Sequence, residues 1–170
     1  MQQKPENVPR LKQAVQLHQQ GLLAQARQAY ADVLARDSRN FDALQLLGLC
    51  CLQQGDLNSA LDLLNRALSL RTDVPSVYVH RAIVQGRLDR VQQALDDFGK
   101  AIVLNPRAAD TYYNRGNLLR GKGRLEEAAE DYRKASSIDP RRAEYLNNLA
   151  GVLQTLNRRE EALACYEKLV

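Results

Sequence analysis

The sequence repeats itself at an interval of 34 residues, and this period constrains the fold more than any other feature. The segment from Ser76 to Pro106 aligns without a gap with the segment from Asp110 to Pro140. Because such a period is typical of stacked repeats, each unit is expected to bury its apolar face against its neighbours. The same interval divides the chain into windows 7–40, 41–74, 75–108, 109–142 and an incomplete 143–170.

Small and large side chains recur at fixed positions in these windows. The eighth position holds Ala14, Gly48, Ala82, Gly116 and Ala150. The twentieth holds Ala26, Ala60, Ala94, Ala128 and Ala162. The twenty-fourth holds Tyr30, Leu64, Phe98, Tyr132 and Tyr166. A small side chain lets two helix backbones approach closely, and a large one opposite fills the remaining space, so the pattern predicts tightly paired helices.

Each window also contains a break between two apolar stretches. The break residues, at the fifteenth position, are Gly21, Gly55, Asp89, Gly123 and Asn157, types that tolerate the left-handed conformation. Apolar residues at helical spacing surround the break, and Pro106 and Pro140 predict the end of a second helix. Leu and Ala also dominate the 45% of apolar residues, which favours helices over strands. Each window is therefore predicted to be a helix, a tight turn, a second helix and a short connection.

These linked positions resemble the tetratricopeptide repeat (TPR) over residues 7–170. The resemblance implies an all-α fold, a right-handed α-solenoid of helix-turn-helix repeats. Residues 1–6 precede the first window and are expected to form a flexible tail. Three features depart from the family pattern. Arg10 stands where a large apolar residue is expected, and the first two windows lack the proline that ends the second helix. Val33 and Leu169 replace the alanine of the twenty-seventh position. Since the fifth window is incomplete, we expect the chain to be a fragment of a longer protein.

Residues suited to catalysis are sparse. The only histidines, His18 and His80, lack partners at metal-site or triad spacing. The acidic residues early in the fourth window are expected to form a solvated helix face: Glu126, Glu127, Glu130 and Asp131. The three cysteines include no C-x-x-C pair, which disfavours a disulfide framework or a zinc site, and Cys50 and Cys51 are expected in the core. We therefore predict no enzyme activity, no cofactor and no metal.

The charge pattern and the N-terminus bear on the setting. Lys and Arg number 24 against 20 Asp and Glu, a net charge of +4 that is scattered rather than clustered. This distribution argues against nucleic acid as the partner. The first residues do not form a secretory signal, and no 18-residue apolar run occurs. We expect a cytoplasmic protein that binds neither nucleic acid nor membrane.

The TPR resemblance implies that the first helix of each repeat lines a concave, peptide-binding groove. The groove residues that it assigns to this chain are Leu46, Leu49, His80, Tyr113, Asn114, Asn117, Arg120, Asn147 and Asn148. The same family positions include Asp110 and Glu144. The groove is thus expected to be apolar near its start and rich in amides near its end.

Asparagine is unfavourable within a helix, so the four groove asparagines call for a reason. An amide can both donate to and accept from the main chain of a bound peptide. Asn114 and Asn148, at equivalent positions, resemble two rungs of the asparagine ladder of O-linked N-acetylglucosamine transferases. Asn117 and Asn148 also match part of a carboxylate clamp, although Tyr113 replaces its lysine.

Two functions remain open at this point. The first is a non-catalytic scaffold that binds a partner peptide or helix in its groove. The alternative is the substrate-recruiting arm of a larger bacterial glycosyltransferase resembling the O-linked N-acetylglucosamine transferases. In either case, exposed terminal repeats allow a homodimer.

Overall fold

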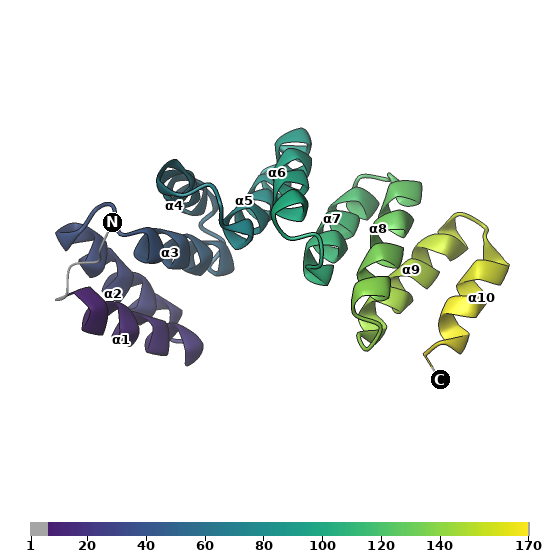
Figure 1. The fold of residues 1–170 in the computed structure, drawn as a ribbon, viewed down its shortest axis with the longest axis horizontal. Coiled ribbons are helices and arrows are strands. Elements are labelled where there is room, and N and C mark those ends of the chain that lie inside the picture. The colour runs from purple at the N-terminus through teal and green to yellow at the C-terminus, as the bar shows by residue number, and fades with distance from the viewer. Residues whose placement is uncertain (1–6, 170) are drawn as a thin grey trace. The chain divides into compact units, whose positions relative to one another are not determined.

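The computed structural model describes residues 7–169, so the predicted tail at residues 1–6 lies outside the described part of the chain. Ten helices and no strand occur in this range (Figure 1). The helices are α1 (Asn7–Gln19), α2 (Leu23–Arg36), α3 (Phe41–Gln53), α4 (Leu57–Leu70), α5 (Pro75–Arg87), α6 (Val91–Leu104), α7 (Ala109–Gly121), α8 (Leu125–Ile138), α9 (Ala143–Thr155) and α10 (Arg159–Glu167).

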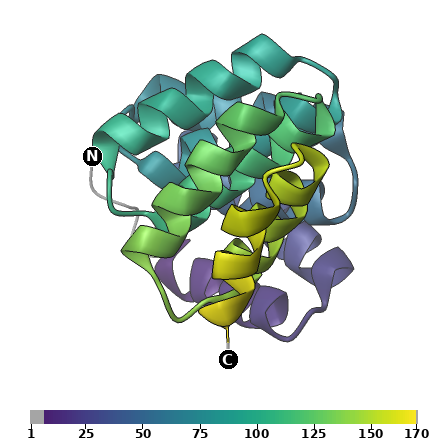
Figure 2. The same cartoon turned by 90° about the vertical axis from the view of Figure 1, so that its right-hand side faces the viewer.

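The chain divides into two compact units, which we describe separately. Unit 1 ends at Ala94 and unit 2 begins at Leu95, so the boundary falls within α6. In unit 1, each of the helices α1 to α4 packs against the next. In unit 2, α7 packs against α8, α8 against α9, and α9 against α10 (Figure 2). Both units are therefore stacks of helical hairpins.

All five predicted breaks adopt the left-handed conformation. The backbone angle φ is 75° at Gly21, 81° at Gly55 and 73° at Gly123, and it is 60° at both Asp89 and Asn157. After each break, the next residue donates its N–H to the carbonyl five residues earlier, at N···O distances of 2.8–3.0 Å. This hydrogen bond closes a Schellman motif, which ends the first helix and allows the chain to reverse.

The small residues at the eighth and twentieth positions allow the helices to approach closely. The five alanines of the twentieth position are at most 2% exposed. A Cβ atom built on Gly116 lies 2.9 Å from Cε1 of Tyr132, and one built on Gly48 lies 3.0 Å from Cγ of Leu64. The large residue of the second helix thus lies directly over the glycine of the first, which confirms the predicted pairing of small and large side chains.

Helix ends follow local signals in the sequence. The Asn40 side chain accepts a hydrogen bond from the N–H of Ala43 at 3.0 Å, which caps α3, and Pro75 opens α5. The helices α6 and α8 end two residues before Pro106 and Pro140, as predicted. The helices α2 and α4 end at the equivalent places without a proline.

One prediction about the acidic residues of α8 is wrong. Glu126, Glu127 and Glu130 are exposed, but Asp131 is only 4% exposed and does not belong to a solvated face. Its two carboxylate oxygens accept hydrogen bonds from Nε and Nη2 of Arg115, both at 2.7 Å. The hydrogen bonds to Asp131 raise the pKa of Arg115. A charged residue that follows exposed glutamates can thus turn inward when a partner on the preceding helix neutralises it.

Candidate peptide-binding face

The predicted groove residues divide between the two units. Leu46 and Leu49 lie on α3 and His80 on α5, all in unit 1 and all half-buried. The other six lie in unit 2, on the first helices of two successive hairpins: Tyr113, Asn114, Asn117 and Arg120 on α7, and Asn147 and Asn148 on α9. Most of the candidate site therefore lies on one face of unit 2.

A chain of hydrogen bonds joins α7 to α9 on this face. The Tyr113 hydroxyl donates to Oε1 of Glu144 and accepts from Nδ2 of Asn148, the latter at 2.9 Å. Nη1 of Arg120 donates to Oδ1 of Asn148 at 3.1 Å. The network therefore holds the side chains of Tyr113, Arg120, Glu144 and Asn148 together.

The ring of Tyr113, which belongs to this network, packs against the rings of two further tyrosines. The ring centroid of Tyr113 lies 5.8 Å from that of Tyr132 and 5.2 Å from that of Tyr145. The Tyr132 hydroxyl donates to Oδ1 of Asn117, and the Tyr145 hydroxyl to Oδ1 of Asp110, both at 2.7 Å. Burial raises the pKa of Tyr132 and of Tyr145 to about 12. Both phenols therefore stay protonated and hold these side chains in place near neutral pH.

The four asparagines are not equivalent. Asn117 and Asn148 bind neighbouring side chains, as described above. Within the described part of the chain, the side chains of Asn114 and Asn147 form no hydrogen bond. Asn114 is half-buried and Asn147 is exposed. The two predicted ladder rungs therefore differ, since Asn148 is engaged within the protein while the donors and acceptors of Asn114 are unused among the described residues.

The unit 1 residues provide a different surface. Leu46 and Leu49 offer partly exposed apolar side chains on α3. Burial lowers the pKa of His80, so its imidazole is neutral near neutral pH. His18 hydrogen-bonds through Nδ1 to the Tyr30 hydroxyl at 3.2 Å and through Nε2 to Oε1 of Gln53 at 2.8 Å. This part of the chain is suited to apolar contacts with a partner.

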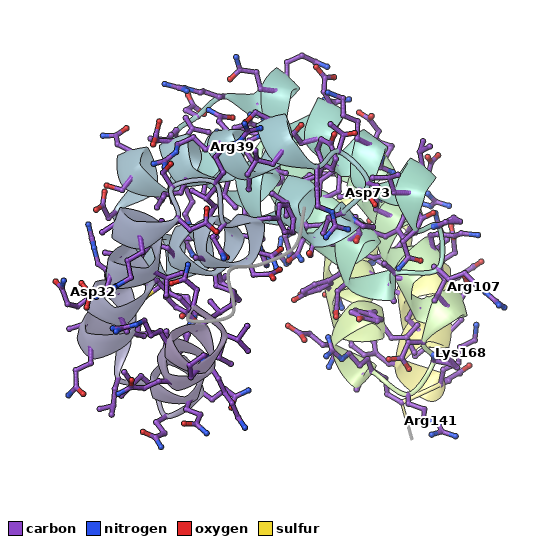
Figure 3. The ribbon with its side chains drawn as sticks, turned by 60° about the vertical axis from the view of Figure 1, so that its left-hand side comes forward. Asp32, Arg39, Asp73, Arg107, Arg141 and Lys168 are labelled. Atoms are coloured by element: carbon purple, nitrogen blue, oxygen red, sulfur yellow. The ribbon has the colours of Figure 1, made fainter. Side chains whose placement is uncertain are left out.

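Most arginines whose contacts are described pair with carboxylates. These pairs are Arg27–Asp56, Arg66–Asp62, Arg71–Asp73, Arg115–Asp131, Arg124–Glu127, Arg133–Glu161, Arg142–Asp110 and Arg158–Glu161. Arg107 and Arg141 lie in the connections before α7 and α9 and extend outward (Figure 3). In the described range, no group of His, Cys, Asp and Glu could hold a metal ion, and no helix is long and apolar enough to cross a bilayer.

Sequence reasoning missed two aspects of this face. It placed Asp110 and Glu144 among the groove positions but did not predict their bonds to Tyr145 and Tyr113. It also passed over Gly151, an exposed residue of α9 between the groove asparagines and the helix end. A glycine in the middle of a predicted helix was the available signal, because glycine weakens a helix.

Consecutive helical hairpins, each closed by a left-handed turn and packed through small residues, define a class of helical repeat proteins. Family models of the tetratricopeptide repeat match residues 11–75, 109–142 and 142–170. The chain belongs to the tetratricopeptide repeat family, and its fold is the predicted all-α solenoid. A comparison with curated proteins found no significant match.

Solved structures agree with this assignment. A crystal structure of MamA is 28% identical in sequence, with a TM-score of 0.83 and coverage of 91% of each chain. MamA from Desulfovibrio magneticus RS-1 is 18% identical, with a TM-score of 0.86, covering 98% of this chain and 94% of that one. YrrB, described as a TPR protein with an unusual peptide-binding site, is 23% identical, with a TM-score of 0.73, covering 95% of this chain and 83% of its own. The last two similarities concern the fold alone.

Proposed function

We propose that this protein is a non-catalytic scaffold that binds a polypeptide partner on the face formed by the first helices of its repeats. The observation that carries the proposal is the unit 2 face, where a fixed network leaves the amides of Asn114 and Asn147 unbound. Such amides match the donors and acceptors of a peptide main chain. Leu46 and Leu49 in unit 1 offer apolar contact area of their own for a polypeptide.

Other features support a polypeptide partner. The net charge is only +4 and is scattered along the chain, and eight of the arginines pair with carboxylates, which favours a polypeptide over nucleic acid. YrrB, which has the same fold, is described as having a peptide-binding site. The three cysteines are free, buried thiols, which fits the reducing cytoplasm. Burial raises the pKa of each thiol, so none is activated as a nucleophile.

The test uses peptides selected by the wild-type protein from a bead-bound library of random short peptides. Replacing both Asn114 and Asn147 by alanine should weaken binding of a selected peptide, measured by fluorescence anisotropy, while the helical circular dichroism stays unchanged. Asn58→Ala, on the exposed surface of the second helix α4, is the matched control. Equal affinity of the double variant and the control would show that the asparagines do not contact the peptide. Binding that collapses with added salt would favour charge-driven recognition instead.

The glycosyltransferase arm is the second candidate function. Asn114 and Asn148, one repeat apart on α7 and α9, are the observation that favours it. The gene sequence beyond residue 170 decides between the two candidates, since a nucleotide-sugar-binding domain downstream would establish the arm and a stop codon would exclude it.

A homodimer through the terminal hairpin also belongs to the proposal. Leu163 is 59% exposed and Tyr166 is 38% exposed, both on α10. With the α10 residue Ala162, they line a shallow hollow of about 410 Å³. Burying these two large apolar side chains against a second copy would remove them from water.

A further inference from the structure

Gly151 has no structural reason to be glycine. It is an exposed residue of α9. The helix α9 packs against both α8 and α10 in unit 2 (Figure 1). A Cβ atom built on Gly151 meets no atom within 4 Å, whereas one built on Gly116 lies 2.9 Å from Tyr132. Its φ is not positive, so alanine fits the backbone without strain. Packing and conformation both permit a side chain at this position.

Glycine at this position also weakens the helix. In the middle of a helix, glycine is less favourable than alanine because more backbone entropy is lost on folding. The equivalent ninth positions of the other repeats all carry a larger side chain: Val15, Leu49, Ile83 and Asn117. Repeat five thus lacks a side chain where every other repeat has one, on the helix face assigned to ligand binding.

The residues one turn away show the same pattern. Asn147, one turn before Gly151, is also unfavourable within a helix, is exposed and forms no hydrogen bond with another described residue. Gln154, one turn after, is exposed as well. Thr155 donates from its hydroxyl only to the carbonyl of Gly151, at 3.0 Å. This strip of α9 therefore offers amides and open backbone, with no large apolar side chain.

We propose that the partner lies on unit 2 as an extended segment whose main chain passes closest to α9 at Gly151, flanked by Asn147. The proposal rests on the proposed function and names the form of its ligand. A helical partner satisfies its backbone groups internally, so its main chain can neither pair with these amides nor approach the position of the missing Cβ. In an extended segment, every second peptide group is free to pair with an asparagine amide of the protein. A glycine in α9 allows the backbone of such a segment to approach the helix closely.

The first experiment compares two glycines that both have open space around Cβ. Gly151→Ala changes the proposed contact, and Gly99→Ala, in the second helix α6, is the matched control. Both should raise the melting temperature by about 1–4 °C, because alanine favours the helix. Only Gly151→Ala should weaken binding of a library-selected peptide, by about tenfold or more, because its methyl group occupies the space of the ligand backbone. Equal affinity of the two variants would overturn the proposal.

The second experiment changes the peptide. A copy of the selected peptide with N-methylated amides keeps its side chains but loses its main-chain donors, and it should bind far more weakly. A copy constrained to a helix by a side-chain staple should not bind. If either copy binds as well as the parent peptide, extended main-chain recognition is wrong, although the scaffold function stands. If no library peptide binds the wild-type protein at all, the proposed function itself fails.

Discussion

The ion pair between Arg115 and Asp131 should be replaceable by two leucines but should not tolerate the loss of either partner alone. The chain itself contains the apolar version of this pair. Two repeats earlier, the equivalent positions of α3 and α4 hold Leu47 and Leu63, each 7% exposed. Unit 2 uses a bidentate ion pair where unit 1 uses two leucines, so the leucine version is already compatible with this repeat.

The exposed fractions of the two side chains set the expected costs. The Asp131 side chain is 6% exposed, so Arg115→Leu leaves a carboxylate buried without a partner and should cost about 3–5 kcal/mol. It also removes the guanidinium that lies 5.9 Å from the Tyr112 ring centroid. The Arg115 side chain is 28% exposed and can reach water, so Asp131→Leu should cost less, about 1–3 kcal/mol. The double leucine variant should be either as stable as the wild type or more stable by roughly 1–4 kcal/mol.

Urea unfolding, followed by the helical circular dichroism signal, measures all four proteins. The m-value should stay constant, since the surface exposed on unfolding hardly changes. From most to least stable, the expected order is the double variant, the wild type, Asp131→Leu and then Arg115→Leu. In thermal melts, each kcal/mol should shift the melting temperature by about 2–4 °C. A double variant as unstable as Arg115→Leu would refute the reasoning, because it would mean that the ion pair supplies packing that leucine cannot.

Three other perturbations probe the core, one titrating group and the terminal hairpin. Ala128→Leu at a fully buried helix contact should lower stability by ~1–3 kcal/mol in thermal melts, whereas Ala164→Leu on exposed α10 should not. Burial lowers the pKa of His80, so the contribution of this residue to the free energy of unfolding is complete above the unfolded-state pKa of about 6.5 and is lost as pH falls. The His80→Gln variant should therefore lose less stability than the wild type on acidification. Urea unfolding free energies that fall in parallel with pH for the two proteins would contradict this. The wild-type protein should sediment as a dimer and the Leu163→Glu variant as a monomer, because the exposed leucine is replaced by a charge. A wild-type protein that sediments as a monomer would contradict the proposed dimer.

The repeat architecture could be predicted from the sequence because its determinants are local. The breaks at Asp89 and Asn157 adopt the same left-handed conformation as the three glycines, so the position in the repeat matters more than the residue type. Burial of the alanines follows from the same period, since each one recurs at a contact between paired helices. Each of these signals requires only the 34-residue spacing and the preferences of single residues.

The chemistry of the face could not be predicted in the same way. Whether Asn148 is available depends on Tyr113 and Arg120, which lie on the preceding hairpin and reach it through side-chain rotamers. The inward turn of Asp131 likewise depends on Arg115, sixteen residues away. Spacing within one repeat does not indicate such pairings, because they are set by the stagger between helices.

The buried thiols give each unit a native reporter of local opening. Cys50 and Cys51 lie on α3 in unit 1, at most 1% exposed, and Cys165 lies on α10 in unit 2, 7% exposed. A thiol-reactive dye can label them only after the covering helices separate, so labelling rates measure opening of the two units in one unmodified protein. Because α10 packs mainly against α9, and Cys165 is more exposed than Cys50 or Cys51, Cys165 should react first.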